Sequence, residues 1–540
     1  MVPQVADIPE NAWRIGVIVI FVIAAVLRVY DLNLVPLHHD EGVNGNFLVR
    51  LVREGQYSYD PGNYHGPTLY YFAALFPWIM RVLFGKSAQE TWGLTTVSIR
   101  MIPALFGLAT IGLVFLMRRW LGTVATLSAA LLLALSPGAI YLSRYFIHET
   151  QFVFFTLGIV VACLYFYEQR SPFYLILAAA SASLLFATKE TAMISVGVLI
   201  IALVVALVYM RLRRGKKPRP VRTKGRQQPQ SGFVMRVIDE FGGPVVLSIC
   251  VALALIAFVG LWLAFYSSFF TNAKGITDSF KTFDVWTKTG TVAHTKPFFT
   301  YAFWLVLREG PVLFLGALGA ILAVLKPKSA TALFSALWAF GIIAAYSLIP
   351  YKTPWLLLNF VVPLALIAGF AVQSIYELDN RQLRLVGVLL LAALSVSAYQ
   401  AIDLNFINYD NDDNRYVYVY AHTTRGMLDL VKQVDRIAAE TDGDRTGITV
   451  VSPDYWPLPW YFRNYSRVGY YGRLAPATEP IIIASESQKA EADANYGEVY
   501  RQVMSNQPDG SFDLRPGVKL VLYERRKGFT PAAPPLTQQP

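Results

Sequence analysis

The feature that most constrains this chain is its series of long apolar segments. A helix needs about 20 apolar residues to cross a bilayer. Only 15% of the residues are charged, against about 25% in a typical soluble protein. We therefore expect a polytopic α-helical membrane protein with about eleven transmembrane helices. They are expected at residues 13–29, 99–116, 124–142, 153–167, 174–187, 193–210, 245–266, 312–325, 332–348, 356–375 and 385–398.

The basic residues orient these helices. Much of the net charge of +11 lies in the run from Arg211 to Arg226, which contains no acidic residue. Lys and Arg accumulate in cytoplasmic loops, so this charge indicates topology and not nucleic-acid binding. A further apolar segment, 67–84, is expected to lie at the outer face as a juxtamembrane helix, because crossing would move the basic loops outside. The outer loops are then 30–98, 143–151, 188–191, 267–311, 349–355 and everything after residue 399.

The last part of the chain changes character near residue 400. It is polar, and its patterns predict one amphipathic helix and three strands, at 427–440, 447–451, 480–484 and 518–523. We expect three parts: a transmembrane domain over 1–400 with a catalytic outer loop at 30–98, a soluble extracytoplasmic α/β domain over 401–528, and a disordered Pro- and Gln-rich tail over 529–540. The chain is expected in the inner membrane of the cell.

An acidic pair, Asp40 and Glu41, follows the first apolar segment within the sequence His-His-Asp-Glu-Gly. Ionisable residues at such a place indicate function by default. A carboxylate here can act as a general base, hold a divalent cation such as Mg²⁺ or Mn²⁺ at Asp40, or only cap a short helix that begins near Val43. The residues alone leave these interpretations open.

Histidines lie in the same outer loops. His38, His39, His65 and His148 can converge, but no His-x-x-x-His spacing or Glu-x-x-His helix supports a zinc site. Apart from metal binding, they can contact substrate. The candidate substrate-binding residues of these loops are His39, Tyr64, His148 and Glu149.

Three cations near the ends of the predicted helices can bind a phosphate. Arg144 offers a guanidinium, which binds phosphate bidentately, or it reaches lipid headgroups as an interfacial residue. Lys189 is followed by Glu190 and is either half of a structural ion pair or a second cation of the same site. Lys352 is the third.

Lys352 lies between aromatic residues, in the sequence Tyr351-Lys352-Thr353-Pro354-Trp355. A lysine flanked by Tyr351 and Trp355 suits an anionic headgroup or a diphosphate. An ordinary aromatic belt at the membrane surface has the same composition. Acids, cations and aromatic residues thus all face one aqueous side of the bilayer, as a reaction between a membrane-bound phosphate-linked donor and an outer acceptor requires.

These segments resemble the GT-C fold glycosyltransferases that use polyprenyl-phosphate sugars, the superfamily of protein O-mannosyltransferases and aminoarabinose transferases. The likeness covers roughly residues 12–370. Within the superfamily, His-His-Asp-Glu-Gly and the His-Gly-Pro variant are most similar to the flippase-activity-associated proteins. The matching residues are Asp40-Glu41, Tyr64-His65-Gly66-Pro67-Thr68-Leu69-Tyr70-Tyr71, Arg100, Ser136-Pro137, Ser143-Arg144 and Thr188-Lys189.

The resemblance implies a site and a reaction. Asp40 would be the catalytic base or the carboxylate that orients the acceptor, with Glu41 beside it. The charge of the leaving lipid phosphate must be neutralised in the transition state, and its displacement would invert the anomeric centre. The residues that would hold this phosphate are His65, Arg144, Lys189 and Lys352.

The sequence departs from the family pattern at one place. Aminoarabinose transferases carry a lysine before a Pro-Pro pair, whereas His65-Gly66 precedes a single proline, Pro67, here. A neutral histidine binds phosphate less well than a lysine does.

Two functions from different classes fit these features. One is transfer of a sugar from a polyprenyl-phosphate donor to a protein or glycolipid acceptor on the extracytoplasmic face. The other is a non-catalytic, flippase-associated protein that binds a lipid-linked sugar. A secondary transporter is disfavoured because the sequence has neither a duplicated half nor an evident broken helix with ionisable residues at mid-depth.

Overall fold

The computed structural model describes residues 8–63, 65–213, 243–292, 295–325, 327, 329–377 and 380–528. The chain forms two compact units. Unit 1 comprises Met1–Leu32 and Gly55–Asn408, and unit 2 comprises Asn33–Glu54 and Tyr409–Pro540. A short part of the first outer loop therefore belongs to the same unit as the C-terminal domain, whereas the sequence prediction placed it in the transmembrane domain.

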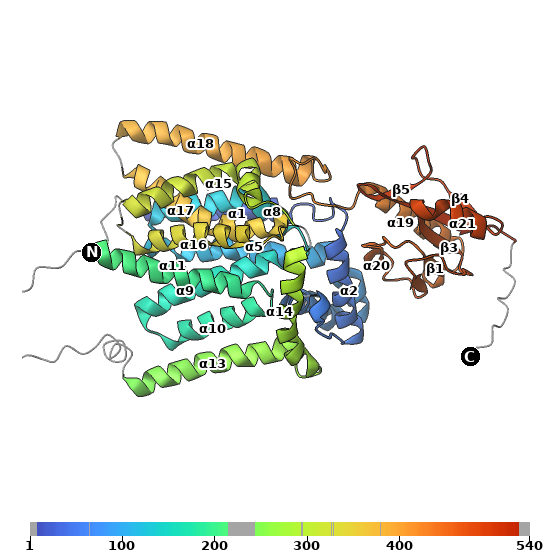
Figure 1. Cartoon of the computed structure of the whole chain (residues 1–540), viewed down its shortest axis with the longest axis horizontal. Helices are drawn as coiled ribbons and strands as arrows, with labels where there is room; N and C mark the ends of the chain where they lie inside the picture. The colour runs from blue at the N-terminus through green and yellow to red at the C-terminus, as the bar shows by residue number, and fades with distance from the viewer. Residues whose placement is uncertain are drawn as a thin grey trace, which may run out of the picture. The chain divides into compact units, whose positions relative to one another are not determined.

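Unit 1 is a bundle of long helices (Figure 1). Among the described residues, nine helices are long and apolar enough to cross a membrane, or ten if the bent pair α7 and α8 counts as one. The one remaining predicted segment, 174–187, corresponds to α10, which is apolar but has only 15 residues. The helices longer than four residues are α1 (Glu10–Val29), α3 (Thr68–Phe84), α5 (Thr96–Leu116), α7 (Thr123–Leu135), α8 (Pro137–Ser143), α9 (Glu149–Gln169), α10 (Pro172–Phe186), α11 (Ala192–Arg213), α13 (Pro244–Tyr266), α14 (Lys274–Val292), α15 (Thr300–Leu325), α16 (Ala330–Leu348), α17 (Leu358–Tyr376) and α18 (Asn380–Ile402).

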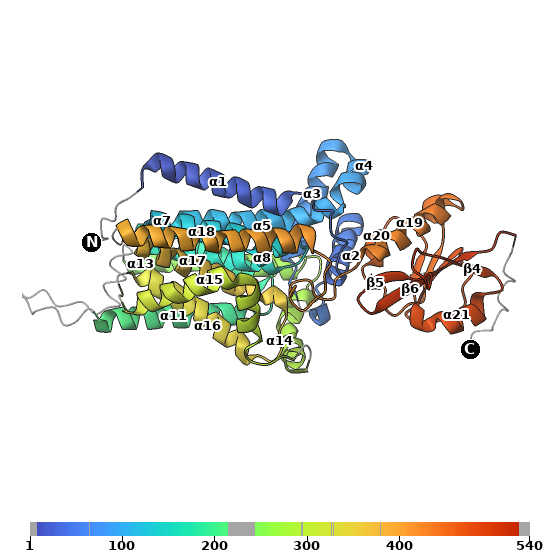
Figure 2. The same cartoon turned by 90° about the horizontal axis from the view of Figure 1, so that it is seen from above.

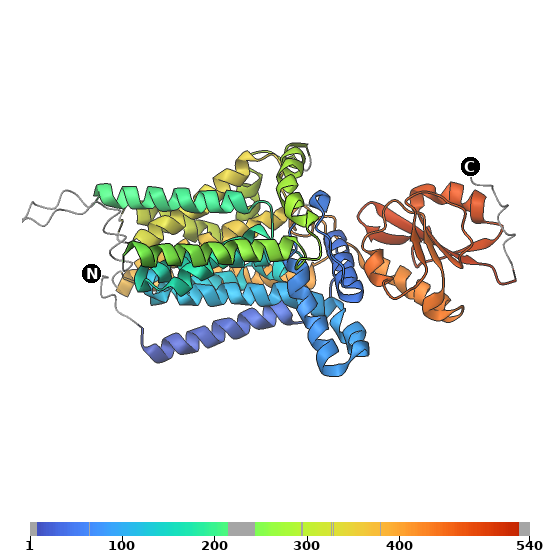
Figure 3. The same cartoon turned by 90° about the horizontal axis from the view of Figure 1, so that it is seen from below.

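Helix α17 lies at the centre of the bundle. It packs against α7, α15 and α16, and 94% of the apolar span that contains it is buried. Helix α13 lies at an edge of the bundle in Figure 1, and helix α1 lies at an edge in Figures 2 and 3. They are buried over only 11% and 17% of their spans, respectively. Their exposed apolar side chains are the surface expected of helices in contact with lipid.

One predicted span is broken. The segment expected as a single helix at 124–142 forms α7 and α8, which are bent by 62° relative to each other. The break falls at Ser136-Pro137, where Ser136 caps α8 and proline cannot continue the hydrogen-bond ladder of α7. Helix α15 is also irregular, with a non-helical backbone at Glu309 before Pro311.

The outer loop predicted at 267–311 is largely helical. It contains α14 and the first part of α15, so the span expected at 312–325 begins at Thr300. Helices α3 and α14 lie across one end of the bundle at a steep angle to the long helices (Figures 1 and 2). For α3, this orientation and its 17 residues agree with the predicted juxtamembrane helix.

Unit 2 contains a six-stranded mixed sheet in the order β2-β1-β3-β6-β4, with β5 also paired to β6. Strands β2, β1 and β3 are parallel, and β6 runs antiparallel to β3, β4 and β5. The strands are β1 (Ile448–Val450), β2 (Val468–Tyr470), β3 (Ile481–Ser485), β4 (Tyr500–Val503), β5 (Phe512–Arg515) and β6 (Val518–Arg525).

The helices of unit 2 are α2 (His39–Glu54), α19 (Arg425–Ala439), α20 (Leu458–Tyr461) and α21 (Lys489–Tyr496). The amphipathic helix predicted at 427–440 is α19, whose apolar side chains pack on the sheet together with Leu458 of α20. The three predicted strands correspond to β1, β3 and β6. The tail at 529–540 and the basic run beyond Arg213 lie outside the described residues.

Candidate active site

The acidic pair lies in the first turn of α2, and the structure separates its two members. The His38 backbone N–H donates to Glu41 Oε2 at 3.0 Å, and the Asp40 backbone N–H donates to His38 Nδ1 at 3.1 Å. This is a reciprocal cap in which His38 takes the place that serine or threonine usually occupies. His38 Nδ1 accepts this hydrogen bond, so Nε2 carries the ring N–H, which donates to the Tyr420 carbonyl at 3.1 Å.

Asp40 is left available for chemistry. Glu41 is fully buried, whereas the Asp40 side chain is 45% exposed and its carboxylate lies 3.7 Å from His38 Nδ1. The neighbouring His39 ring lies 6.1 Å from the Trp456 ring. Burial lowers the pKa of His39 more than the Asp40 carboxylate raises it, so this imidazole is neutral near pH 7.

A second polar cluster lies in unit 1. Backbone hydrogen bonds join Gly66 N–H to the Thr188 carbonyl (3.0 Å) and Thr68 N–H to the Ala187 carbonyl (3.2 Å). A Cβ at Gly66 would collide with the Ala187 carbonyl, so only glycine permits this close approach. The segment His65–Thr68 is thereby fixed against the turn between α10 and α11.

This turn carries a buried ion pair and a histidine–carboxylate contact. Lys189 Nζ lies 2.6 Å from Glu149 Oε1, and His65 Nδ1 lies 3.1 Å from Glu190 Oε2. Burial alone would lower the pKa of Lys189, but Glu149 and Glu190 outweigh it and raise the pKa. Burial would raise the pKa of Glu190, but His65 and Lys189 outweigh it and lower the pKa. Lys189 and Glu190 are therefore both charged. His65, with 31% of its side chain exposed, is the accessible residue of the cluster.

His148 lies beside His65, with their ring centroids 5.1 Å apart. Its Nε2 pairs with the Gly66 carbonyl at 3.0 Å, while its buried Nδ1 has no hydrogen-bond partner among the described residues. Burial lowers the pKa of His148 well below its usual value, and His65 and Lys189 lower it further. His148 is thus a neutral ring that fixes the Gly66 backbone.

Lys352 is buried and has partners of its own. Its ammonium donates to the carbonyls of Ser347 (3.1 Å) and Ile349 (2.6 Å) at the end of α16, and it lies 5.7 Å from the centre of the Tyr301 ring. Burial lowers the pKa of Lys352. The side chain therefore caps a helix C-terminus, a position where cations are stabilising.

Arg144 has a similar place at the end of α1. Its guanidinium donates to the carbonyls of Tyr30 and Asp31 and lies 4.7 Å from the Phe406 ring. Burial lowers the pKa of Arg144 to about 10. The sequence interpretations of this residue were phosphate binding and headgroup contact, and the structure adds a third, in which it fixes the chain that leaves α1.

The remaining predicted residues lie in different places. Trp355 is buried, with its ring 5.5 Å from that of Tyr145. Tyr351 pairs with Thr295 in an isolated bridge. Tyr64 lies outside the described residues. The contacts described here join His65, His148, Glu149 and Lys189 in one cluster, and His39, Asp40 and Glu41 in another.

Sequence reasoning missed a buried charged group at the break between α7 and α8. Glu309 accepts hydrogen bonds from the Ser136 hydroxyl (2.9 Å) and the Gly138 N–H (2.9 Å) at the start of α8. Arg28 donates to the carbonyls of Leu133 (3.0 Å) and Ala134 (3.2 Å) at the end of α7. A broken helix with ionisable partners is therefore present, where the sequence predicted one continuous span at 124–142. Glu309 followed by Pro311, and proline at 137, were signals that could have indicated it.

The described residues bring together no complete set of cation ligands in either unit. Among the described residues, no three His, Cys, Asp or Glu side chains come together as metal ligands. Mg²⁺ is often held by one or two carboxylates and substrate phosphates. A cation at Asp40 would thus need its other ligands from water and the donor, and it stays a prediction.

Comparison with known proteins supports the predicted resemblance. Residues 18–271 match the family model of dolichyl-phosphate-mannose-protein mannosyltransferases. No curated protein matches the chain in sequence.

The fold is similar to that of two kinds of solved structure. ArnT from Cupriavidus metallidurans, solved bound to undecaprenyl phosphate, has a TM-score of 0.61 and 14% identity, with 96% of this chain and 99% of that chain covered. The oligosaccharyltransferase of Archaeoglobus fulgidus, solved with a tethered acceptor peptide, has a TM-score of 0.53 and 14% identity, with 97% and 75% covered. The chain therefore has the GT-C fold of the polyprenyl-phosphate-sugar-dependent glycosyltransferases, as its sequence motifs predicted.

Proposed function

We propose that this protein is an inverting membrane glycosyltransferase that moves a sugar from a polyprenyl-phosphate donor to a protein or glycolipid acceptor on the extracytoplasmic face. The mannosyltransferase family match over residues 18–271 supports sugar transfer. The similar structures of ArnT with undecaprenyl phosphate and of the archaeal oligosaccharyltransferase AglB with dolichol-phosphate support a lipid-phosphate donor.

The observation that carries the proposal is the separation of the two acids in α2. Glu41 is buried and holds the His38 N–H, while Asp40 keeps a carboxylate that solvent reaches. A general base must come within hydrogen-bond distance of the proton that it takes. An acceptor hydroxyl can reach the exposed carboxylate of Asp40, whereas the carboxylate of Glu41 is buried.

In the proposed reaction, Asp40 accepts the proton of the acceptor hydroxyl or orients that hydroxyl. The acceptor oxygen attacks the anomeric carbon as the bond from that carbon to the phosphate oxygen breaks, so the configuration inverts. The electron pair of the broken bond leaves on the lipid phosphate. That phosphate gains charge in the transition state and needs a positive partner.

His65 is the strongest candidate for that partner. It is the exposed member of the cluster in unit 1, and its Nδ1 lies 3.1 Å from the buried carboxylate of Glu190. Lys189 supports it by holding Glu149 and by lowering the pKa of Glu190. Arg144 and Lys352 already donate to backbone carbonyls, so we assign them weaker contributions to phosphate binding.

The test is transfer of label from a panel of radiolabelled polyprenyl-phosphate sugars in membranes. The substitution Asp40→Asn removes the base and should lower transfer by about 100-fold or more. The matched control is Glu41→Gln, because glutamine can also accept in a capping box, and it should keep most of the activity. Wild-type transfer by Asp40→Asn would overturn the assignment. Lipid binding without transfer from any donor would favour the non-catalytic function.

A further inference from the structure

We propose that the C-terminal domain positions the acidic helix, so that Trp460, Pro457 and Tyr461 set the orientation of Asp40. The inference rests on the proposed function, because it matters to transfer only if Asp40 takes part. All contacts that carry it lie within unit 2. The three residues belong to the aromatic segment Tyr455–Tyr461 and are about 400 positions away from α2 in the sequence.

Two glycines bring α2 against this segment. A Cβ at Gly42 would lie 2.6 Å from Pro457 Cβ, and a Cβ at Gly45 would lie 2.6 Å from Trp460 Cε3. Real Cβ atoms do not approach other atoms so closely, so any larger residue would push the helix away. Trp460 is only 1% exposed, and Leu458 beside it belongs to the core of the sheet domain. The surface that α2 meets is therefore fixed.

Hydrogen bonds hold the start of α2 to the same domain. The Leu37 N–H donates to the Tyr461 hydroxyl at 3.0 Å. One residue later, His38 donates to the Tyr420 carbonyl at 3.1 Å while its other ring nitrogen caps the helix. His38 therefore both caps α2 and anchors it to Tyr420. Asp40 follows His38 by two residues.

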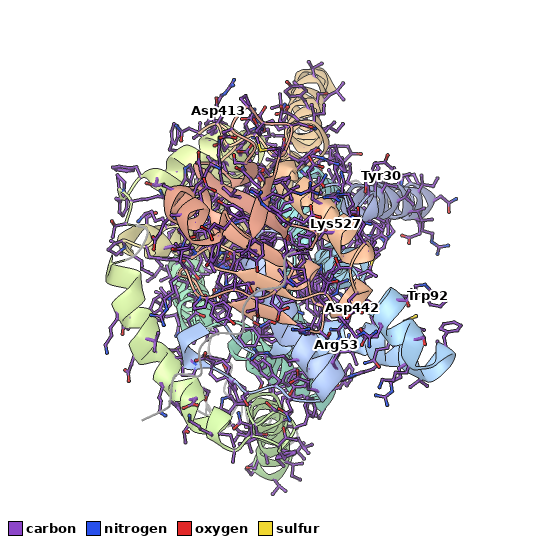
Figure 4. All side chains as sticks on the ribbon, turned by 90° about the vertical axis from the view of Figure 1, so that its right-hand side faces the viewer. Tyr30, Arg53, Trp92, Asp413, Asp442 and Lys527 are labelled. Carbon is purple, nitrogen blue, oxygen red and sulfur yellow. The ribbon has the colours of Figure 1, made fainter. Side chains whose placement is uncertain are left out.

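The far end of α2 is anchored as well. Arg53, labelled in Figure 4, donates to Asn464 Oδ1 at 2.7 Å and also to the Arg463 carbonyl. Contacts therefore hold α2 at its beginning, its middle and its end.

The helix needs this support. Isolated helices of about 15 residues are marginal in water, and glycine is the poorest helix former after proline. With 16 residues and two glycines, α2 depends on packing for its stability. Trp460, Pro457 and Tyr461 are positioning residues, because they act on Asp40 through the helix.

The test is Gly45→Ala in the full-length protein. Alanine favours helix more than glycine does, so a loss of function cannot be attributed to weaker helix propensity. We expect kcat to fall by about 10- to 100-fold, since misplacement by about 1 Å has effects of this size. The KM for the lipid donor should change little, and amide hydrogen exchange within 39–54 should accelerate. Gly112→Ala is the control, because an added Cβ there meets no atom within 4 Å.

A milder variant guards against misfolding. Tyr461→Phe removes only the hydroxyl that accepts from Leu37 and keeps the ring. It should lower kcat by a smaller factor and accelerate exchange near residue 37, without lowering the unfolding temperature by more than a few degrees.

The outcomes distinguish a failure of this inference from a failure of the proposed function. Faster exchange in Gly45→Ala with wild-type kcat would overturn the inference, and so would a fall in kcat with unchanged exchange. Unchanged exchange and unchanged kcat would overturn it too. Wild-type transfer by Asp40→Asn would instead overturn the role of Asp40 under the proposed function, while exchange would still report whether the domain holds α2.

Discussion

The two polar clusters of this protein hold their charges in different ways. In unit 1, Lys189 forms a buried ion pair with Glu149, and Glu190 contacts His65, whose side chain is the most exposed of the four. In α2, one acid is used as a cap and the other is left exposed. The comparison teaches that an acid-rich motif is best interpreted residue by residue, because partners and exposure distinguish a structural acid from one that is free to react.

The largest effect is expected from breaking a buried pair. Lys189→Met leaves the Glu149 carboxylate buried without its cation, and should cost about 3–5 kcal/mol of unfolding free energy. Removing both charges together, with Lys189→Met and Glu149→Gln, should cost less. The control is Lys432→Met, whose ion pair with Asp429 is exposed and is worth about 0–1 kcal/mol. Thermal unfolding in detergent measures the stability of the two single variants and the double variant. Equal losses of unfolding free energy in Lys189→Met and Lys432→Met would contradict the comparison.

The next largest effect on stability is expected from the substitution of Lys352. Lys352→Met leaves the carbonyls of Ser347 and Ile349 without their donor, which should cost about 1–3 kcal/mol of stability. The KM for the lipid donor should change less than threefold if the lysine is mainly a cap. A rise in KM of about tenfold or more, with unchanged unfolding temperature, would show that Lys352 is a phosphate ligand instead.

His65 should affect donor binding more than stability. His65→Gln removes the proposed partner of the donor phosphate and should weaken donor binding about tenfold, or about 1.4 kcal/mol. His65→Lys restores a cation of the kind that aminoarabinose transferases carry and should retain donor binding. Equal binding by the glutamine and wild-type proteins would remove His65 from the phosphate site.

The smallest effect is a dependence of stability on pH. The pKa of His148 is well below its ordinary value in the folded state, so below about pH 6.5 the unfolded chain takes up a proton that the folded chain does not. The unfolding free energy should therefore decrease as the pH is lowered, by at most about 1.4 kcal/mol per pH unit for this group. His148→Gln should reduce the slope between pH 7 and 5.5, and an unchanged slope would contradict the neutral ring.

The sequence predicted the elements with strong local patterns. The long apolar segments became helices, and the buried runs at β1, β3 and β6 became strands. The strands β2, β4 and β5 were missed because they have only three or four residues each, and only β5 alternates buried and partly buried positions over that length.

The site could be predicted only in part. The sequence singled out Asp40 and Lys189 as candidates because their charges stand out in an apolar chain. The contact of Gly45 with Trp460 could not be found, since it joins positions 415 apart and neither residue has a local pattern that names its partner. For the same reason, the carbonyl partners of Arg144 and Lys352 became evident only from the fold.

The most direct test of the account compares transfer by wild type, Asp40→Asn and Glu41→Gln with one accepted radiolabelled donor. The account predicts that Asp40→Asn loses about 100-fold or more of the transfer rate, while Glu41→Gln stays within a few-fold of wild type. The reverse pattern, with an active Asp40→Asn and an inactive but folded Glu41→Gln, would contradict it.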